Sequence, residues 1–247
     1  MNAELYALTH RGNPGDVAFY RRVCRGAESV LELGAGYGRL LGVLSAVKRR
    51  VIGLELDREF LLLAKRNLRK LPTPRRRSVR LLSGDMRDFA LPEPVERVLL
   101  PYNALYCLLM KRDALACFRA ARRALVPGGV FALDVWNAGP FHDTISLRAS
   151  ADDTEPIVTV RHAGQSWDVF ERSRVRRAQR LDVEYRYVSR ASGASRVIPI
   201  AQRYYLAAEV EALLTRAGFA LQARYGDFSG HRFTSRSPQL VVLARAI

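Results

Sequence analysis

Three glycines at alternating positions follow a short apolar run near the start of the chain. Gly34, Gly36 and Gly38 come directly after Val30–Leu33 and directly before a stretch whose apolar periodicity predicts a helix. Glycine is needed where the backbone takes a positive φ or lies against a ligand without a Cβ in the way. A glycine turn between a parallel strand and a helix is where doubly wound α/β folds bind nucleotide-like cofactors. Arg39 occupies the place of the third glycine in the dinucleotide pattern G-x-G-x-x-G, which argues against NAD(P).

A second apolar run ends in acidic residues. Val51–Leu54 leads into Glu55, which comes 19 residues after Gly36. An acidic side chain at the end of such a strand can accept hydrogen bonds from both ribose hydroxyls of a nucleotide. Asp57 has the residue type of an N-cap for a helix that opens at Arg58. The glycine loop and the acidic strand end at this distance make a far stronger signal than either one alone.

The elements that must position these residues can be read from the alternation along the chain. Between residues 29 and 135, short β-branched runs alternate with longer amphipathic ones, as in a parallel sheet flanked by helices. The stretch Val126–Gly129 predicts a helix stop and a turn, and Gly218 predicts a helix C-cap. We expect strands at Ser29–Leu33, Arg50–Glu55, Val79–Ser83, Arg97–Pro101, Val130–Val135, Phe219–Tyr225 and Gln239–Ala244, and helices at Pro14–Cys24, Arg39–Val47, Arg58–Leu71, Asp113–Leu125 and Ala207–Ala217.

Residues 156–205 show a different pattern, in which apolar and polar residues alternate with a period of two. Turns at Ala163-Gly164 and at Ala191-Ser192-Gly193 separate the runs, as in antiparallel hairpins. We therefore expect a core made of residues 1–145 and 206–247, and an inserted antiparallel β subdomain of residues 146–205. Its expected strands are Ile157–Val160, Trp167–Phe170, Leu181–Val188 and Arg196–Ile200.

The segment from Glu32 to Gly38, together with Glu55, resembles the motifs of the class I S-adenosylmethionine-dependent methyltransferases, and the resemblance covers nearly the whole chain. It implies an α/β fold, with a doubly wound, mostly parallel seven-stranded sheet of the Rossmann-like methyltransferase type and an inserted antiparallel β subdomain. It also implies S-adenosyl-L-methionine as cofactor and S-adenosyl-L-homocysteine as product. Within the family, the sequence most resembles small-molecule members of the nucleotide-sugar or amino-acid N-methyltransferase type.

The resemblance also implies which residues hold the cofactor. The glycine loop matches the place of the methionyl part, Glu32 faces its amino end directly or through a water, and Glu55 is the ribose ligand. Asp85 and Met86 match positions that contact adenine, with an ordinary acidic turn as the alternative. The full set implied to bind the cofactor is Tyr20, Glu32, Gly34, Ala35, Gly36, Glu55, Leu56, Asp85, Met86, Pro101 and Asn103.

The acceptor side follows the family pattern less closely. Small-molecule members often carry a histidine near the position of Cys107, which this chain lacks. Tyr6 and Tyr20 match N-terminal aromatic residues that cover the cofactor in relatives, with packing against the sheet as an equal alternative. His142 is a candidate base, although a lone histidine is more often structural. The candidate catalytic residues are His142, Tyr106 and Asp227, and the candidate acceptor-binding residues are Trp136, Asn137, Tyr204 and His231.

The implied reaction is an in-line displacement of the sulfonium methyl group by an acceptor atom. Holding the reactants in line supplies much of the rate enhancement, and a general base adds to it where the acceptor must lose a proton. Because an amine acceptor needs no dedicated base, N-methylation is slightly favoured over O-methylation. The Tyr-rich end of the insert, Arg203–Tyr205, resembles a lid, and such inserts build dimer contacts in relatives, so a homodimer is a further hypothesis.

The charge leaves a second function open. Forty Lys and Arg against 24 Asp and Glu give a net charge of +16, and only four of the forty are lysines. Such a field attracts anionic partners, so an anionic small-molecule acceptor or an RNA substrate is an alternative. Arginine-rich coding with solvated side chains is the plainer explanation, and the densest cluster, Arg75–Arg77 with Arg80, falls in an expected proline-flanked loop. A non-catalytic cofactor-binding protein is a third alternative, because fold alone does not prove turnover.

The cysteines and the apolar runs of the chain bear on its metal content and its location. The three cysteines, Cys24, Cys107 and Cys117, have no metal-like spacing, so we expect reduced, buried thiols and no metal. No apolar run resembles a signal peptide or a membrane span, so we expect a cytoplasmic protein.

Overall fold

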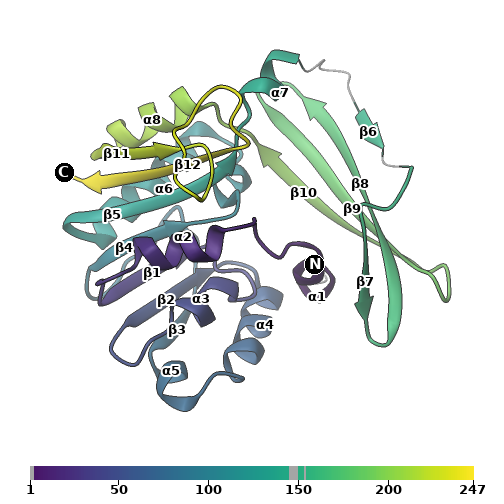
Figure 1. The fold of residues 1–247 in the computed structure, drawn as a ribbon, viewed down its shortest axis with the longest axis horizontal. Coiled ribbons are helices and arrows are strands. Elements are labelled where there is room, and N and C mark those ends of the chain that lie inside the picture. The colour runs from purple at the N-terminus through teal and green to yellow at the C-terminus, as the bar shows by residue number, and fades with distance from the viewer. Residues whose placement is uncertain (1–2, 145–149, 153) are drawn as a thin grey trace.

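The computed structural model describes residues 3–144, 150–152 and 154–247, and a seven-stranded sheet in the order β11-β12-β5-β4-β1-β2-β3 forms its centre (Figure 1). The strands from β3 to β5 pair in parallel, whereas β12 is antiparallel to both of its neighbours. The seven strands are β1 (Ser29–Leu33), β2 (Arg50–Glu55), β3 (Val79–Ser83), β4 (Val95–Leu100), β5 (Leu125–Trp136), β11 (Phe219–Tyr225) and β12 (Gln239–Ala246).

Helices cover both faces of this sheet because its central strands are apolar on both sides. Successive side chains of a strand point to opposite faces. In β1, Val30 packs into the cluster beneath the helices α2 and α3, while Leu31 and Leu33 pack into the cluster beneath α6 and α8. The helices of the core are α2 (Asp16–Val23), α3 (Arg39–Leu44), α4 (Arg58–Leu68), α5 (Thr73–Arg77), α6 (Lys111–Ala124) and α8 (Ala207–Arg216).

A second, antiparallel sheet stands beside the core (Figure 1). It has the order β10-β9-β8-β6, and β7 also pairs with β8. Leu5 of α1 is buried against this sheet with Trp167 and Tyr187, and α1 also contacts α4, so α1 lies between the second sheet and the core. The elements outside the core sheet are α1 (Ala3–Thr9), the 3-10 turn η1 (Ala104–Cys107), α7 (Gly139–Thr144), β6 (Ser150–Asp152), β7 (Val158–His162), β8 (Gln165–Arg176), β9 (Arg180–Ser189) and β10 (Ser195–Arg203).

The expected fold class is confirmed, and several boundaries differ. The strands β1, β2, β3 and β11 begin and end where the pattern predicts. The predicted helix stop before Val126–Gly129 is confirmed, since α6 ends at Ala124, but the expected turn is part of β5, which starts at Leu125 and whose register against β4 shifts here. The expected loop around Arg75–Arg77 is also wrong, since it contains α5. Both helix ends predicted from side-chain chemistry are confirmed: Asp57 caps α4, and Gly218 follows α8 with a φ of +87°.

Among the described residues, the structure shows no helix long and apolar enough to cross a membrane. The predicted division at residues 145/146 falls on residues outside the described ones, and the division into core and insert stays a prediction.

Candidate active site

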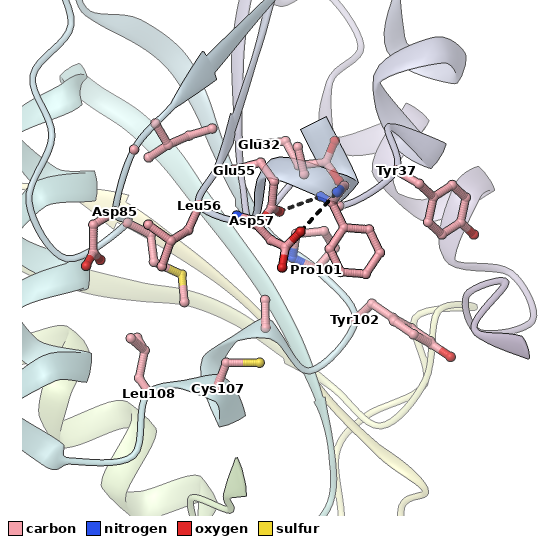
Figure 2. Close-up of a pocket in the computed structure, with 18 of the residues that line it drawn as sticks. Glu32, Tyr37, Glu55, Leu56, Asp57, Asp85, Pro101, Tyr102, Cys107 and Leu108 are labelled. Atoms are coloured by element: carbon pink, nitrogen blue, oxygen red, sulfur yellow. Dashed lines mark hydrogen bonds between the residues drawn. The ribbon is translucent and has the colours of Figure 1, made fainter. Parts of the chain in front are cut away.

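The carboxyl ends of β1, β2, β3 and β4 open into one cavity of about 850 Å³ (Figure 2). In open α/β sheets, ligands bind outside the carboxyl ends of the strands, at the point where the strand order reverses. Here the order reverses between β1 and β4, since β2 and β3 lie to one side and β5 to the other. The volume is within the range of small-molecule sites. The topology therefore places a ligand site at the glycine loop.

The glycine loop is held by the carboxylate at the end of β2. Gly36 has a φ of +54°, and its N–H donates to Oε2 of Glu55 at 2.7 Å. The N–H of Asp57 donates to Oε1 of the same carboxylate at 2.8 Å. Each oxygen of a carboxylate has two acceptor sites, so Glu55 keeps capacity for further donors while its orientation is fixed. The acidic residue that the spacing singled out therefore lies at the cavity with a set direction (Figure 2).

Glu32 brings a buried carboxyl group to the same cavity. It is only 3% exposed, and its Oε2 has no hydrogen-bond partner among the described residues. Burial raises the pKa of Glu32 to about 8; the carboxylates of Glu55 and Asp16 add to the rise, and the guanidinium of Arg39 opposes it. A buried polar atom without a partner is costly. Glu32 therefore provides a place for a cationic donor.

A buried ion pair ties the N-terminal segment to the glycine loop. Nη1 and Nη2 of Arg39 lie 3.0 and 2.7 Å from the two carboxylate oxygens of Asp16, which is 3% exposed. The N–H of Asn13 donates to Asp16 as well. This pair was not predicted from the sequence, because Arg39 was used there only as the residue that replaces a glycine. A usable signal was that Asp16 and Arg39 are charged residues at the first positions of two helices.

The opposite end of the cavity has an apolar wall and one polar edge. Asp85 and Leu108 lie at one side of the view in Figure 2, and Tyr37 and Tyr102 lie at the other. Asp85 accepts from Nε of Arg87 at 2.9 Å, and these hydrogen bonds hold the pKa of Asp85 below its usual range. Cys107 is exposed and faces the cavity, so the expectation of three buried thiols is wrong at this position.

The wall next to β4 is shaped by a strained turn. Tyr102 and Asn103 both have left-handed backbone, with φ of 55° and 60°. Oδ1 of Asp134, which is 1% exposed, accepts from the N–H of Tyr102 at 3.0 Å and from the hydroxyl of Tyr20 at 2.5 Å. Oδ1 of Asn103 accepts from the N–H of Trp136 at 2.7 Å. Tyr20 and Asn103 therefore support this wall from behind and do not line the cavity.

The other residues predicted to bind the cofactor are brought together by the fold. Each belongs to a different strand end or to the glycine loop, and all border the same space. They are Glu32, Gly34, Ala35, Gly36, Glu55, Leu56, Asp85, Met86 and Pro101. Their contact with a cofactor stays a prediction.

The candidate catalytic residues Tyr106 and His142 lie away from this cavity. Tyr106 is fully buried, and its hydroxyl donates to the carbonyl of Trp136 at 2.7 Å. Nδ1 of His142 in α7 lies 3.0 Å from the hydroxyl of Tyr204, and neither residue lines the cavity. Both aromatic acceptor candidates, Trp136 and Tyr204, pack against each other in this group.

The remaining candidates lie in the loop between β11 and β12, as Asp227 and His231 do, or against it, as Asn137 does. Oδ2 of Asp227 lies 2.6 Å from Nδ1 of His231, and Oδ1 accepts three backbone N–H groups of the same loop. Asn137 donates to the carbonyl groups of Ser235 and Ser237. These side chains organise the loop between β11 and β12, and none of them lines the cavity.

The cavity instead has an aromatic side that sequence reasoning largely missed. Tyr6, His10, Tyr37, Phe60 and Tyr102 line it. Only Tyr6 was singled out, because the first ten residues lack a clear period. The hydroxyl of Tyr37 donates to the carbonyl of His10 at 2.9 Å, so the N-terminal segment is fixed onto the glycine loop.

The charge of the cavity is opposite to that of the whole chain. The chain carries +16, yet more acidic than basic side chains face the cavity. The acidic residues are Glu32, Glu55, Asp57, Asp85 and Asp113, and the basic ones are Arg39, Arg58 and Arg87. Such a lining favours cationic ligands.

Comparison with known proteins places this site in a family. Residues 30–129 match the family model described as "Methyltransferase domain". The chain is 30% identical over 142 residues to a dTDP-3-amino-3,6-dideoxy-alpha-D-glucopyranose N,N-dimethyltransferase of Streptomyces fradiae, and the match covers 54% of this chain and 52% of that protein. It is 24% identical over 226 residues to the cypemycin N-terminal methyltransferase of a Streptomyces species, with 87% and 82% covered.

A solved structure extends the likeness to the whole fold. The CcbJ methyltransferase from Streptomyces caelestis superposes with a TM-score of 0.82 at 26% identity, over 97% of this chain and 94% of that one. The chain spans only about half the length of the first curated relative, so its acceptor is not taken from that protein. Residues 30–129 are therefore a methyltransferase domain, and the chain as a whole is similar in sequence and fold to the CcbJ methyltransferase.

Proposed function

We propose that the protein transfers a methyl group from S-adenosyl-L-methionine to an amino nitrogen of a small molecule by in-line displacement. The observation that carries this proposal is the acidic cavity of a strongly basic chain, with the unpartnered Oε2 of Glu32 beside the glycine loop. The two curated relatives support the choice of nitrogen, since their names specify an N,N-dimethyltransferase and an N-terminal methyltransferase.

The residues present fit the cofactor. The buried carboxyl group of Glu32 suits the ammonium group of the methionyl part, and the backbone of Gly34 and Gly36 leaves room beside it. Glu55 suits the ribose hydroxyls, and Asp85 suits the amino group of adenine. When bound, S-adenosyl-L-methionine supplies a methyl group that its sulfonium charge already activates.

The chain itself must hold the acceptor in line and exclude water. Holding two reactants at near-attack distance is worth roughly 7–11 kcal/mol of the barrier. Rigid walls favour such alignment. The turn at Tyr102, which is hydrogen-bonded to Asp134, fixes one side of the cavity, and the Asp16–Arg39 ion pair fixes another. We propose residues 146–205 as the acceptor-side subdomain, because α1 joins that sheet to the cavity wall.

The lining also favours an amine over an anionic acceptor. The carboxylates repel phosphate or carboxylate groups, and the guanidinium groups of Arg39 and Arg87 are already paired with Asp16 and Asp85. A neutral amine attacks through its own lone pair and needs no proton removed beforehand. A hydroxyl acceptor needs a strong base, whereas the histidine that lines the cavity, His10, is a weak one because burial lowers its pKa to about 4.

The test compares matched acceptors. Calorimetry first measures binding of S-adenosyl-L-homocysteine to the full chain. Formation of S-adenosyl-L-homocysteine from the cofactor is then followed with 3-amino-3,6-dideoxyglucose, a free N-terminal peptide, and the 3-hydroxy counterpart of the amino sugar. We expect turnover of an amine and none of the hydroxyl control. Turnover of the hydroxyl compound alone would overturn the choice of nitrogen, and cofactor binding without turnover of any acceptor would support the non-catalytic alternative.

A further inference from the structure

One histidine reaches the cavity from a part of the chain that no motif marked. His10 follows α1 directly and lines the cavity together with Glu32, Gly36 and Glu55. The position where the family resemblance suggests a histidine holds Cys107 in this chain. A thiol is a weak hydrogen-bond acceptor, so Cys107 does not replace the ring nitrogen of a histidine there. The nitrogen base of this cavity comes from the N-terminal segment instead.

The hydrogen bonding of His10 fixes which ring nitrogen carries the proton. Nδ1 lies 3.1 Å from the carbonyl oxygen of Tyr6. Because a carbonyl oxygen only accepts, Nδ1 must carry the hydrogen, and the lone pair of a neutral ring then lies on Nε2. Burial lowers the pKa of His10 to about 4, so the ring is neutral near pH 7. No described residue makes a hydrogen bond to Nε2.

The ring is also held in one orientation. It stacks on Tyr6 with centroids 3.9 Å apart and planes 8° apart. The Tyr185 ring from β9 lies perpendicular to it with ring centroids 4.5 Å apart, and the centroid of the Tyr102 ring is 6.4 Å away. The hydroxyl of Tyr37 holds the backbone carbonyl of the same residue at 2.9 Å. A ring fixed on several sides presents Nε2 in a constant direction.

Two carboxylates of the cavity already hold protein donors, and the proposed function assigns Glu32 to the ammonium group of the cofactor. Both oxygens of Glu55 hold backbone N–H groups, and Asp85 holds Arg87. Burial raises the pKa values of the Tyr6 and Tyr102 hydroxyls, so neither supplies a base near pH 7. Among the described cavity residues, His10 is the neutral nitrogen with an unused lone pair.

Resting on the proposed function, we infer that Nε2 of His10 accepts a hydrogen bond from the amino group of the methyl acceptor and so directs the nitrogen lone pair toward the methyl group. In the step, the amine lone pair forms the new N–C bond and the S–C bond breaks. The bonding pair returns to sulfur, which becomes a neutral thioether. The methylated ammonium keeps its proton, shares it with Nε2, and loses it to water after release.

The test uses a ligand of known structure and does not need the acceptor. Sinefungin carries an amino group where the cofactor carries the transferable methyl group, whereas S-adenosyl-L-homocysteine has nothing there. Calorimetry measures both dissociation constants for the full chain and for His10→Asn, His10→Gln and His10→Phe. In His10→Asn, the amide mimics Nδ1 and keeps the hydrogen bond to Tyr6. In His10→Gln, the side-chain carbonyl mimics the acceptor at Nε2. His10→Phe keeps only the ring stacking.

We expect the unaltered protein to bind sinefungin about tenfold or more tightly than S-adenosyl-L-homocysteine, as a hydrogen bond to a charged donor provides. His10→Asn and His10→Phe should lose that preference and keep their affinity for S-adenosyl-L-homocysteine within about twofold, which also shows that they fold. His10→Gln should retain most of the preference. The same order in kcat for an amine acceptor would support the role in transfer.

Two results would overturn the inference. One is an unaltered protein that binds both ligands equally, and the other is a preference that survives in His10→Asn or disappears equally in His10→Gln. A different result bears on the proposed function: if the unaltered protein binds neither ligand, the cofactor site itself is refuted. The two failures are therefore distinguishable in one set of titrations.

Discussion

Replacing Glu32 with glutamine tests the electrostatics of the cofactor site most directly. The substitution keeps the shape of the side chain and removes its ability to ionise. Glu32 is 3% exposed with an unpartnered oxygen, and burial raises its pKa from 4.5 to about 8. The folded, ligand-free protein therefore holds this proton more tightly than the unfolded chain does.

The sign and size of the effect follow from proton linkage. For an acid whose pKa is raised by folding, the stabilisation is complete below the unfolded pKa and is lost as the pH rises toward the folded pKa. One pKa unit corresponds to about 1.36 kcal/mol, so the free energy of unfolding should fall by about 3 kcal/mol between pH 4.5 and 7 because of Glu32 alone. The fall should continue to about pH 8 and then stop.

Urea unfolding of the ligand-free protein at several pH values measures this effect. The free energy of unfolding of Glu32→Gln should not fall in this way. Its advantage over the unaltered protein should therefore grow from pH 5 to pH 8. Glu28→Gln, at an exposed glutamate, is the matched control and should follow the unaltered protein. Parallel pH profiles for Glu32→Gln and the unaltered protein would refute a buried carboxyl group with a raised pKa.

Ligand binding supplies an independent check on the same residue. If Glu32 ionises to pair with the ammonium group of the ligand, binding of S-adenosyl-L-homocysteine at pH 7 should release close to one proton. Calorimetry in buffers of different ionisation enthalpy counts that proton. Glu32→Gln should release none and bind at least tenfold more weakly, since a charged hydrogen bond is lost. Proton release unchanged in the variant would assign the proton to another group.

Three further substitutions test the frame around the site by urea unfolding. Asp57→Ala removes the cap of α4 and should cost about 1 kcal/mol, whereas Asp88→Ala at an exposed carboxylate should cost nearly nothing; equal costs would contradict the cap. Arg39→Met leaves the buried carboxylate of Asp16 without its partner and should cost about 3 kcal/mol, so a change under 1 kcal/mol would show that the pair is not buried. Gly36→Ala meets no protein atom nearer than 4.0 Å, so only its φ of +54° should matter, at about 1–2 kcal/mol; a much larger loss would show a clash absent from the structure.

Much of the cofactor side could be predicted from the sequence because its signals are local. The glycine loop, Glu55 and Asp57 each act through backbone within a few residues or through the neighbouring parallel strand, and the strand ends bring them together. Strands buried on both faces, such as β1, are continuous apolar runs and were placed to the residue.

The acceptor side depends on contacts between distant segments, which periodicity does not carry. His10 meets Tyr185 across most of the chain, and Tyr20 meets Asp134 behind the sheet. The chemically attractive residues Asp227 and His231 were chosen for their types, but they bind each other in a surface loop. Short helices such as α1 were missed because they are stabilised by packing rather than by a marked pattern.

The placement of Tyr6 and His10 ahead of the first core strand has an evolutionary consequence. The wall that we propose for the acceptor is encoded by the opening stretch of the chain, which β9 supports through Tyr185, whereas the proposed cofactor contacts are encoded between β1 and η1. Mutation can therefore remodel one stretch while the other is conserved under its own selection. Chimaeras that exchange the first fourteen residues and β9 between homologues should swap acceptor preference with the affinity for the methyl donor intact.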